Sequence, residues 1–236
     1  MILSVNHVSK SYLLDTVIKD ASFHIEEREK AALVGLNGAG KTTLFNCMNE
    51  DVPIDGGSIV LEDNNGSKRP LTADDIGYVL STPVVPDFLT AREFIRFFLD
   101  INRGKIESPR EPDEYLDYMQ IDQEDRFKLI KDFSHGMKNK MQLLVNFIAD
   151  PPILLLDEPL TALDVVMADE MKRLLKRRKQ SHITILSTHI MELALDICDD
   201  IVILHNGVLA PVSRDQLDDA AYKDRIIAAL KEESNA

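Results

Sequence analysis

Short, continuous apolar runs alternate along this chain with stretches of helical periodicity. Residues 31–34, 153–156 and 183–186 are such runs, and each has the length of a strand that is buried on both faces. Residues 2–30 differ, because they combine short strand-like pieces with turn residues, as do residues 58–61 and 76–80. The pattern predicts an α/β fold with a mainly parallel core sheet and a separate antiparallel β layer.

A mostly helical insert is predicted over about residues 86–150. Residues 90–93 have the sequence of a capping box, and a stripe of large apolar side chains at helical spacing follows it. A second helix is expected from about residue 137, and a third around residues 115–119. Such stripes are more often core than a cofactor site, so we expect burial of Phe94, Phe97, Phe98 and Ile101 in the first helix, and of Met141, Leu144, Val145 and Ile148 in the second.

Composition and charge narrow the class of protein. The chain has 236 residues, of which 44% are hydrophobic, so we expect a single globular domain over residues 1–236. Twenty-seven Lys and Arg against 40 Asp and Glu give a net charge of -13, which disfavours general nucleic-acid binding. The apolar runs are far shorter than the about 20 residues of a membrane-spanning helix. We see no secretory signal, and Cys47 and Cys198 form no metal or redox motif.

The first apolar run leads into a segment that matches the phosphate-loop pattern GxxxxGK[ST], with the sequence Gly35-Leu36-Asn37-Gly38-Ala39-Gly40-Lys41-Thr42. Its glycines let backbone N–H groups wrap an anion, and the helix that follows points its positive end at the phosphates. We expect Lys41 to reach the β and γ phosphates and Thr42 to offer its hydroxyl to Mg²⁺. The alternative, a Gly-rich turn with a solvated lysine, requires a chance match that average composition makes rare.

Polar residues also follow the other two apolar runs. Asp157 is placed to hold Mg²⁺ directly or through water, and Glu158 to orient and deprotonate an attacking water. His189 follows the third run, and we expect it to contact a γ-phosphate. Taken alone, the acidic pair also fits a helix cap or a surface pair, and the histidine fits a structural residue. Since ligands bind beyond the carboxyl ends of strands in a doubly wound sheet, the three clusters are expected to converge on one site.

Together these motifs resemble the ATP-binding subunit, or nucleotide-binding domain, of ABC transporters. The resemblance covers nearly the whole chain. The motifs occur in the order of that family: residues 8–12 near the start, the phosphate loop at 35–42, a signature-like segment at 133–137, the strand that ends at Asp157 with Glu158, a D-loop-like segment at 161–164, His189, and a hairpin with an Asn206-Gly207 turn.

The resemblance implies a P-loop NTPase fold in which the helical insert is the family's helical subdomain, and it implies an Mg-dependent ATPase. Lys41, Glu158 and His189 are the implied catalytic residues, and Thr42 and Asp157 are the implied Mg²⁺ ligands. Tyr12 is implied to stack on adenine, although a strand-edge tyrosine also has packing value alone. The remaining implied ATP contacts are Gly35, Leu36, Asn37, Gly38, Ala39, Gly40, Lys41, Thr42, Thr43, Ser134 and Gly136.

The resemblance also implies partners. Two copies dimerise head to tail, with each ATP held between the phosphate loop of one copy and the signature segment of the other. A separately encoded membrane permease completes the transporter, which places this chain at the cytoplasmic face of the membrane, and no nucleic-acid partner is expected. The energising subunit of an exporter is the leading reading, because the Ser-x-Gly-Met-Lys form of residues 134–138 resembles exporter subunits.

The chain departs from the family's motifs at two places, and there are two alternatives to the transporter function. Ser81 occupies a position where the family commonly has a Gln that reaches Mg²⁺, and residues 135–137 are His-Gly-Met rather than Gly-Gly-Gln. One alternative is a soluble regulator of translation with the same ATPase fold, although such proteins typically have two tandem cassettes. The other is an inactive nucleotide sensor, against which the presence of Glu158 and His189 argues.

Overall fold

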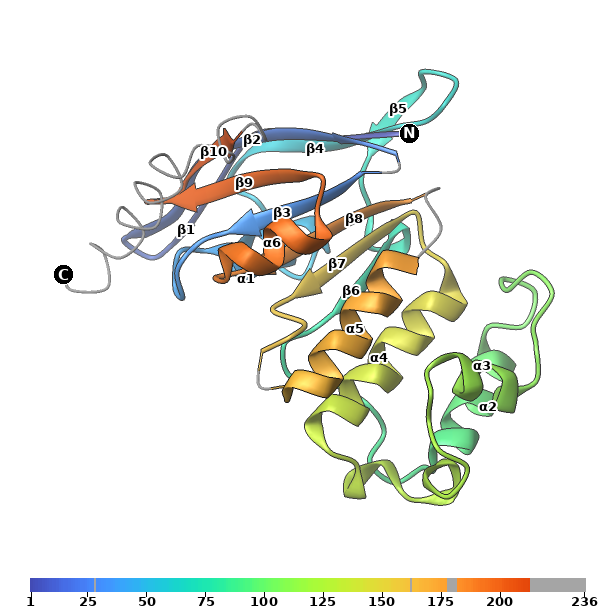
Figure 1. Cartoon of the computed structure of the whole chain (residues 1–236). Helices are drawn as coiled ribbons and strands as arrows, with labels where there is room; N and C mark the ends of the chain where they lie inside the picture. The colour runs from blue at the N-terminus through green and yellow to red at the C-terminus, as the bar shows by residue number, and fades with distance from the viewer. Residues whose placement is uncertain (28, 162, 178–181, 213–236) are drawn as a thin grey trace. The chain divides into compact units, whose positions relative to one another are not determined.

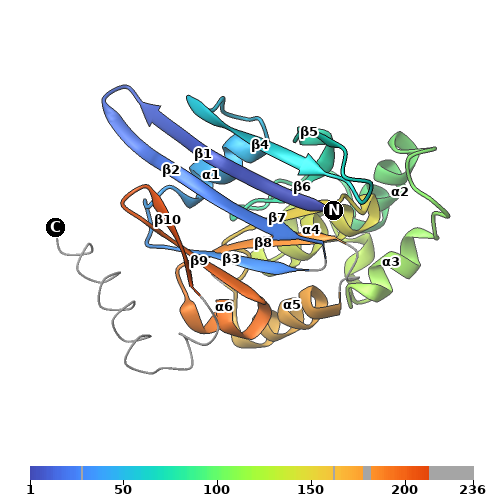
Figure 2. The same ribbon diagram turned by 90° about the horizontal axis from the view of Figure 1, so that it is seen from above.

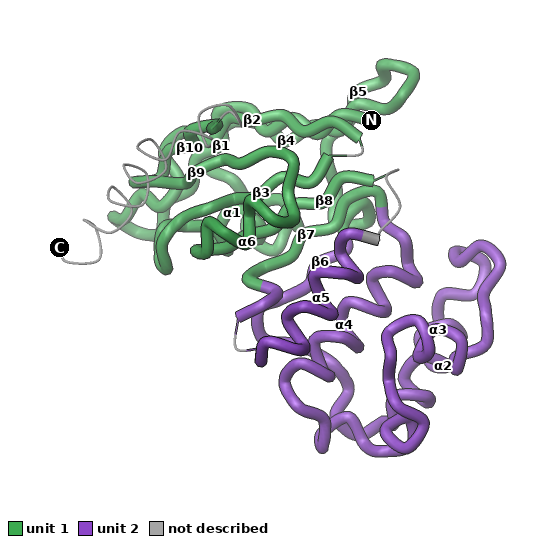
Figure 3. Tube along the Cα trace, in the orientation of Figure 1, with its two compact units in different colours: residues 1–76, 152–158, 179–236 green, residues 77–151, 159–178 purple. Residues whose placement is uncertain are grey.

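The chain forms two compact units, shown in Figure 3. Unit 1 comprises Met1–Ile76, Pro152–Glu158 and Lys179–Ala236, and unit 2 comprises Gly77–Pro151 and Pro159–Arg178. The computed structural model describes residues 1–27, 29–161, 163–177 and 182–212. The sequence-based expectation of a single domain with an insert over about 86–150 stays a prediction, and each unit is described by itself below.

Unit 1 contains a mixed sheet (Figures 1 and 2) with the strand order β5-β4-β1-β2-β10-β9-β3-β8-β7. The neighbours β9, β3, β8 and β7 run parallel, whereas β5, β4, β1 and β2 pair antiparallel. This confirms a mainly parallel core with an antiparallel β layer. The strands are β1 (Ile2–Tyr12), β2 (Asp15–Glu26), β3 (Lys30–Val34), β4 (Gly56–Glu62), β5 (Lys68–Pro70), β7 (Ile153–Asp157), β8 (Ile183–Thr188), β9 (Asp200–His205) and β10 (Val208–Val212).

The three apolar runs form the centre of this sheet. All residues of β7 and β8 are buried, as are the last four residues of β3. Helix α1 (Lys41–Met48) contacts β2 and β7, and helix α6 (Met191–Ile197) lies alongside β3 and β8 (Figure 1). Strands buried in this way need apolar side chains on both faces, which explains why these segments are continuous apolar runs rather than alternating ones.

The opening of the chain differs from the expectation of short strands. β1 and β2 have 11 and 12 residues and form one long hairpin (Figure 2), which is interrupted by register shifts between Val5 and Ser11. Leu13 and Leu14 make the turn, and Leu13 has a φ of 55°, a left-handed conformation that is uncommon for leucine. The segment also lacks an Asn-Gly or Asp-Gly turn signal.

The expectation that residues 76–80 belong to the antiparallel layer is wrong, because β6 (Ile76–Val79) pairs with none of β1, β2, β4 and β5.

Unit 2 is mostly helical. Its helices are α2 (Ala91–Ile101), α3 (Pro112–Tyr118), α4 (His135–Ala149) and α5 (Val165–Arg177), joined by the short 3₁₀ helices η2 (Asp125–Phe127) and η3 (Ile130–Asp132), while η1 (Ala73–Asp75) belongs to unit 1. The predicted capping box at α2 is confirmed: Glu93 N donates to Thr90 Oγ1 (3.2 Å), and Thr90 N donates to Glu93 Oε2 (2.9 Å). Within the described ranges, no helix is long and apolar enough to cross a membrane.

The apolar stripes of unit 2 are only partly core. On α4, Met141, Leu144 and Ile148 are buried as expected. On α2, however, Phe97 and Ile101 are 52% and 61% exposed, which contradicts the expectation of a fully buried stripe. Full burial on α2 is confined to its first five residues and Phe98 is half-buried, so the packing weakens toward the end of the helix. A helical stripe shows which side chains share a face, but not how far along the helix the neighbouring elements extend.

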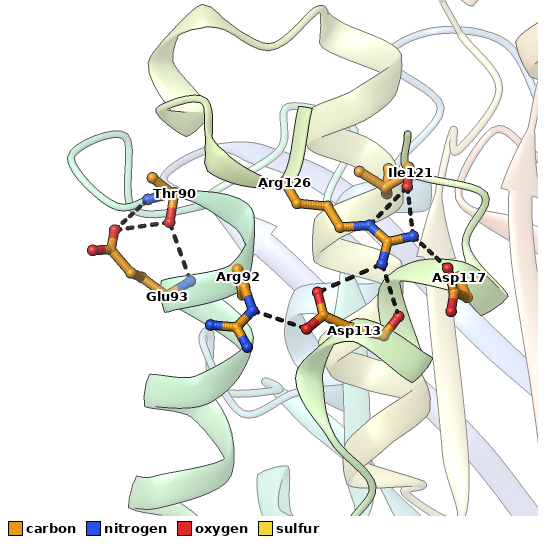
Figure 4. Close-up of polar contacts among 7 residues, drawn as sticks. All are labelled: Thr90, Arg92, Glu93, Asp113, Asp117, Ile121 and Arg126. Atoms are coloured by element: carbon orange, nitrogen blue, oxygen red, sulfur yellow. Dashed lines mark hydrogen bonds and ion pairs between the residues drawn. The ribbon is translucent and has the colours of Figure 1, made fainter. Parts of the chain in front are cut away.

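A buried arginine holds the small helices of unit 2 together (Figure 4). Arg126 is only 3% exposed, and its Nε and Nη2 both donate to Ile121 O at 3.1 Å. It also donates to the carboxylates of Asp113 and Asp117, the first at 3.5 Å. Arg92 binds the other oxygen of Asp113 at 2.9 Å, and these two arginines, Arg92 first, hold the pKa of Asp113 below its ordinary value. The planar guanidinium thus ties η2 to α3, and through Asp113 to α2.

Replacing Arg126 with methionine is expected to loosen α3 and η2. The buried Ile121 carbonyl loses both guanidinium donors, Asp117 loses its arginine partner and Asp113 keeps only Arg92, so the opening free energy of amides in residues 113–127 should fall by about 2 to 4 kcal/mol. Native-state hydrogen exchange of the full chain measures this. The control is Arg103→Met, since Arg103 is 83% exposed and pairs with Asp100, and it should change protection by less than about 0.5 kcal/mol. Equal protection in the two variants would contradict the role of Arg126.

Candidate active site

The candidate site begins at the loop between β3 and α1, residues 35–40. Gly38 and Gly40 have φ angles of 87° and 104°, which glycine adopts without strain. A Cβ on Gly40 would also lie 2.8 Å from Val17 Cγ1 of β2, too close for any side chain. Gly38 is therefore needed for its backbone conformation. Gly40 is needed both for its conformation and for its close packing on the β1–β2 hairpin.

Lys41, the first residue of α1, points back over the loop. Its buried Nζ donates to the carbonyls of Gly35 (2.7 Å) and Leu36 (2.9 Å). The same ammonium lies 3.2 Å from Glu158 Oε1, which follows β7. A cation that is surrounded by loop carbonyls and one carboxylate is well placed to exchange those neutral carbonyls for phosphate oxygens, because charge-assisted hydrogen bonds are stronger than neutral ones.

The buried carboxylate of Asp157 connects three elements at the end of β7. Thr42 Oγ1, from α1, donates to Asp157 Oδ2 at 2.8 Å, and Ser187 Oγ, from β8, donates to Oδ1 at 2.5 Å. Both oxygens of the carboxylate therefore have a hydroxyl donor, as a buried charge requires. The prediction that the segments after β3, β7 and β8 converge agrees with this geometry.

Glu158 sits in an uncommon backbone conformation beside His189. Its φ is 48°, the left-handed region, and its N–H donates both to Ser187 O (3.2 Å) and to Ser187 Oγ (3.1 Å). Its side chain is mostly buried, and Oε2 lies 2.9 Å from His189 Nδ1. Strained backbone of this kind is found where the surrounding structure holds a side chain in a required direction, often at functional sites.

The donor set near Asp157 fits a Mg²⁺ ion that arrives with a nucleotide. Among the residues that the structure describes, no group of three or more His, Cys, Asp or Glu side chains is arranged to hold a metal. What is present is one carboxylate and one hydroxyl, Asp157 and Thr42, within 2.8 Å of each other. Mg²⁺ in phosphate-transfer sites is typically bound by one or two such oxygens together with phosphate oxygens and water.

Tyr12 ends β1 and is 44% exposed. It lies in unit 1 on the hairpin whose Val17 packs against Gly40 of the loop. The side chain of Lys10 lies over its ring, with Nζ 5.4 Å from the ring centroid. The structure therefore gives Tyr12 an exposed ring on the hairpin that contacts the loop.

The signature-like residues belong to unit 2, whereas the phosphate loop belongs to unit 1. Ser134 is the N-cap of α4, and its Oγ accepts a hydrogen bond from Met137 N (3.2 Å). Gly136 is buried, and a Cβ there would lie 2.7 Å from Met167 Cγ of α5. Asp164 caps α5 by accepting from Met167 N at 2.9 Å, whereas Ala162 of the D-loop-like segment is outside the described residues. The glycine thus lets two helix ends approach closely.

Comparisons with known proteins point to the same family that the sequence motifs resemble. The family model described as "ABC transporter" matches residues 18–161. The ABC-type transporter ATP-binding protein EcsA of Bacillus subtilis is 30% identical over 99% of this chain and 98% of its own length. The chain belongs to the ABC transporter family. It is an ATP-binding subunit with ATPase activity, and its fold is that of the P-loop NTPases, as predicted.

A further relative and a solved structure extend the comparison. The sulfate/thiosulfate import ATP-binding protein CysA of Nocardia farcinica is 30% identical over 89% of this chain and 64% of its own length. The solved structure of an ATP-binding subunit of an ABC transporter covers 98% of this chain and 100% of that chain, with 26% identity and a TM-score of 0.80. Relatives of this ABC subunit thus include an import protein, so membership of the family does not establish export.

Ser187 contacts both acidic residues of the site, a role that the sequence pattern does not predict. It is fully buried, and its hydroxyl is the donor to Asp157 and an acceptor for Glu158 N. It therefore orients both acidic residues of this ABC subunit. A serine at the end of a buried strand is an ordinary sequence feature; only its place two residues before His189, on the strand next to β7, points to the role.

Replacing Ser187 with alanine is expected to slow ATP hydrolysis while leaving ATP affinity nearly unchanged. The Glu158 backbone and the Asp157 carboxylate each lose one hydrogen bond, and loss of such supporting contacts typically lowers activity by about 10-fold or more. Phosphate-release kinetics and calorimetric titration measure the two quantities separately. Ser58→Ala, at an exposed serine on β4, is the control. An unchanged turnover number in Ser187→Ala would show that the hydroxyl does not position the acidic pair.

Proposed function

We propose that this chain hydrolyses Mg-ATP to energise an ABC transporter, with the residues at the ends of β3, β7 and β8 as its catalytic site. The observation that carries the proposal is one set of contacts: Glu158 lies within 3.2 Å of the Lys41 ammonium and 2.9 Å of the His189 imidazole. A phosphate-binding cation and a group that positions the attacking water are parts that recur in phosphoryl-transfer sites, and Lys41 and Glu158 supply them here, with His189 in contact with Glu158.

Each of these groups has a distinct task. The Lys41 ammonium releases the carbonyls of Gly35 and Leu36 and donates hydrogen bonds to β- and γ-phosphate oxygens instead. Its positive charge then stabilises the negative charge on these oxygens. Glu158 then orients the attacking water and accepts its proton, acting as the general base. His189, held against the Glu158 carboxylate, contacts the γ-phosphate and keeps the carboxylate directed at the water. These electrostatic contacts are stronger where water is excluded from the cluster, because the local dielectric constant is then lower.

Thr42 and Asp157 are the residues that would hold Mg²⁺. The ion would supply neutralisation of the phosphate charge when bound. Ser81 is exposed in unit 2, and its side chain is too short to replace the glutamine that the family commonly has at this position. We therefore assign no metal contact to it.

The rest of the nucleotide site follows from the same proposal. The loop residues 35–40 and Thr43 bind the phosphates, and Tyr12 stacks on the adenine. Ser134, with Gly136, binds the γ-phosphate of ATP held by a second copy, since the N-terminus of α4 is an anion site and Ser134 is exposed there. The two copies form a head-to-tail dimer on binding ATP, and each ATP needs one segment from each copy.

A separate permease is the proposed membrane partner, with export as the direction and the cytoplasmic face of the membrane as the location. The proposed docking segment is residues 81–89, where Pro83 and Pro86 favour extended backbone. It carries two strongly exposed apolar side chains, Val84 and Phe88. Exposed apolar groups on a short segment are suited to contact with another protein.

The variant Glu158→Gln is expected to bind ATP but to hydrolyse it about 10²-fold or more slowly, because an amide cannot take the proton from water. It should also accumulate an ATP-bound dimer. Phosphate release measures the first effect, and size-exclusion chromatography with ATP measures the second. The matched control is Glu107→Gln, at an exposed glutamate of unit 2. Wild-type turnover in Glu158→Gln would mean that another group is the base.

Single cysteines at Val84 and Phe88 are expected to cross-link to a polytopic membrane protein in native membranes. The native Cys47 and Cys198 are buried. Burial raises the pKa of both thiols, that of Cys198 to about 12, so the native cysteines do not compete for the reagent. A cysteine at the partly exposed Val208 of β10 serves as the control. Capture of soluble proteins alone, with the chain recovered wholly in the soluble fraction, would contradict the transporter role.

A further inference from the structure

One buried lysine outside the catalytic cluster lies beneath the exposed tyrosine of β1. The side chain of Lys10 is only 9% exposed, and its Nζ lies over the Tyr12 ring, 5.4 Å from the centroid. This distance is within the range of a cation–π interaction. A buried ammonium requires a partner to offset its desolvation, and Asp55 Oδ1 accepts from Lys10 Nζ at 3.1 Å.

Asp55 binds three consecutive residues of β1. Its N–H donates to Ser9 O at 2.9 Å, its Oδ1 accepts from Lys10 Nζ, and its Oδ2 accepts from Ser11 N at 2.6 Å. The Ser11 amide first, and Lys10 next, hold the pKa of Asp55 below its ordinary value, so this group is a carboxylate at neutral pH. Asp55 therefore fixes the end of β1 immediately before Tyr12.

This arrangement prepares one face of the tyrosine ring for stacking. The faces of aromatic rings carry negative charge, so two rings stacked directly face to face repel each other. A cation on the rear face draws that charge away and reduces the repulsion toward a base on the front face. With Lys10 on one face and 44% of Tyr12 exposed, a planar ligand has access to the ring.

We propose that Lys10, held by Asp55, is a positioning residue that strengthens stacking of the nucleotide base on Tyr12. The inference rests on the proposed function, because it takes the assignment of Tyr12 to the base from there. It adds a residue that touches no part of ATP yet raises affinity for the base. The phosphate loop, which binds the other end of the ligand, is unaffected by it.

The test compares two ligands that share the triphosphate but differ in the base. Lys10→Met keeps the length of the side chain and removes the charge. Calorimetric titration of the full chain should show ATP affinity lowered by about 3- to 10-fold, the scale of a partly buried cation–π contact. Affinity for inorganic tripolyphosphate, which has no base, should be unchanged. Lys10→Arg should restore ATP affinity, and Lys68→Met, at an exposed lysine of β5, should have no effect on either ligand.

A double variant shows whether the effect passes through the tyrosine. In a Tyr12→Ala background, Lys10→Met should cause no further loss of ATP affinity. Additive losses, an unchanged ATP affinity in Lys10→Met, or an equal loss for ATP and tripolyphosphate would each overturn the inference. The proposed function fails in a different way: wild type and Lys41→Ala would then bind tripolyphosphate equally, or Tyr12→Ala would leave ATP affinity unchanged.

Discussion

The buried carboxylate of Asp157 is the group on which the rest of the site depends. An unpaired carboxylate in this position would cost several kcal/mol, so the fold must supply donors to both of its oxygens. One donor is the Thr42 hydroxyl at the start of α1, and the other is the Ser187 hydroxyl on β8. This requirement joins the phosphate loop, β7 and β8 at one edge of the sheet. Glu158 and His189 immediately follow these strands, so their positions are set by the same hydrogen bonds.

The cluster that results holds one ammonium, that of Lys41, and two carboxylates, those of Asp157 and Glu158. Lys41 is held partly by backbone carbonyls, which are weaker partners than phosphate oxygens. Glu158 is held by its backbone, through a left-handed turn and two hydrogen bonds from its N–H to Ser187. Its carboxylate also contacts His189 Nδ1 at 2.9 Å, so the direction of the carboxylate does not depend on the lysine alone. A site built in this way can give up the Lys41–Glu158 contact to a triphosphate while Glu158, the proposed general base, stays in place.

In the proposed nucleotide site, unit 1 binds the two ends of ATP through two different kinds of contact. At the phosphate end, backbone N–H groups and one lysine form the binding surface, and glycines make the close approach possible. At the proposed base end, the buried ammonium of Lys10 lies over the exposed Tyr12 ring, and the exposed carboxylate of Asp55 holds that ammonium. Unit 2 contributes neither of these. Its Arg126 network and the close approach of α4 and α5 at Gly136 instead give the signature-like segment a stable frame.

The sequence alone determined the features that have a local pattern. Apolar runs marked the buried strands, the glycine pattern marked the phosphate loop, and the capping box at Thr90 marked the start of α2, because each depends on neighbouring residues only. Contacts between distant residues have no such pattern. Ser187 and Asp157 are 30 residues apart, and Lys10 and Asp55 are 45 apart, so only the tertiary structure brought them together. It also decided the long β1–β2 hairpin and the exposure of Phe97, since a turn at two leucines and the extent of packing along a helix both depend on what lies nearby in space.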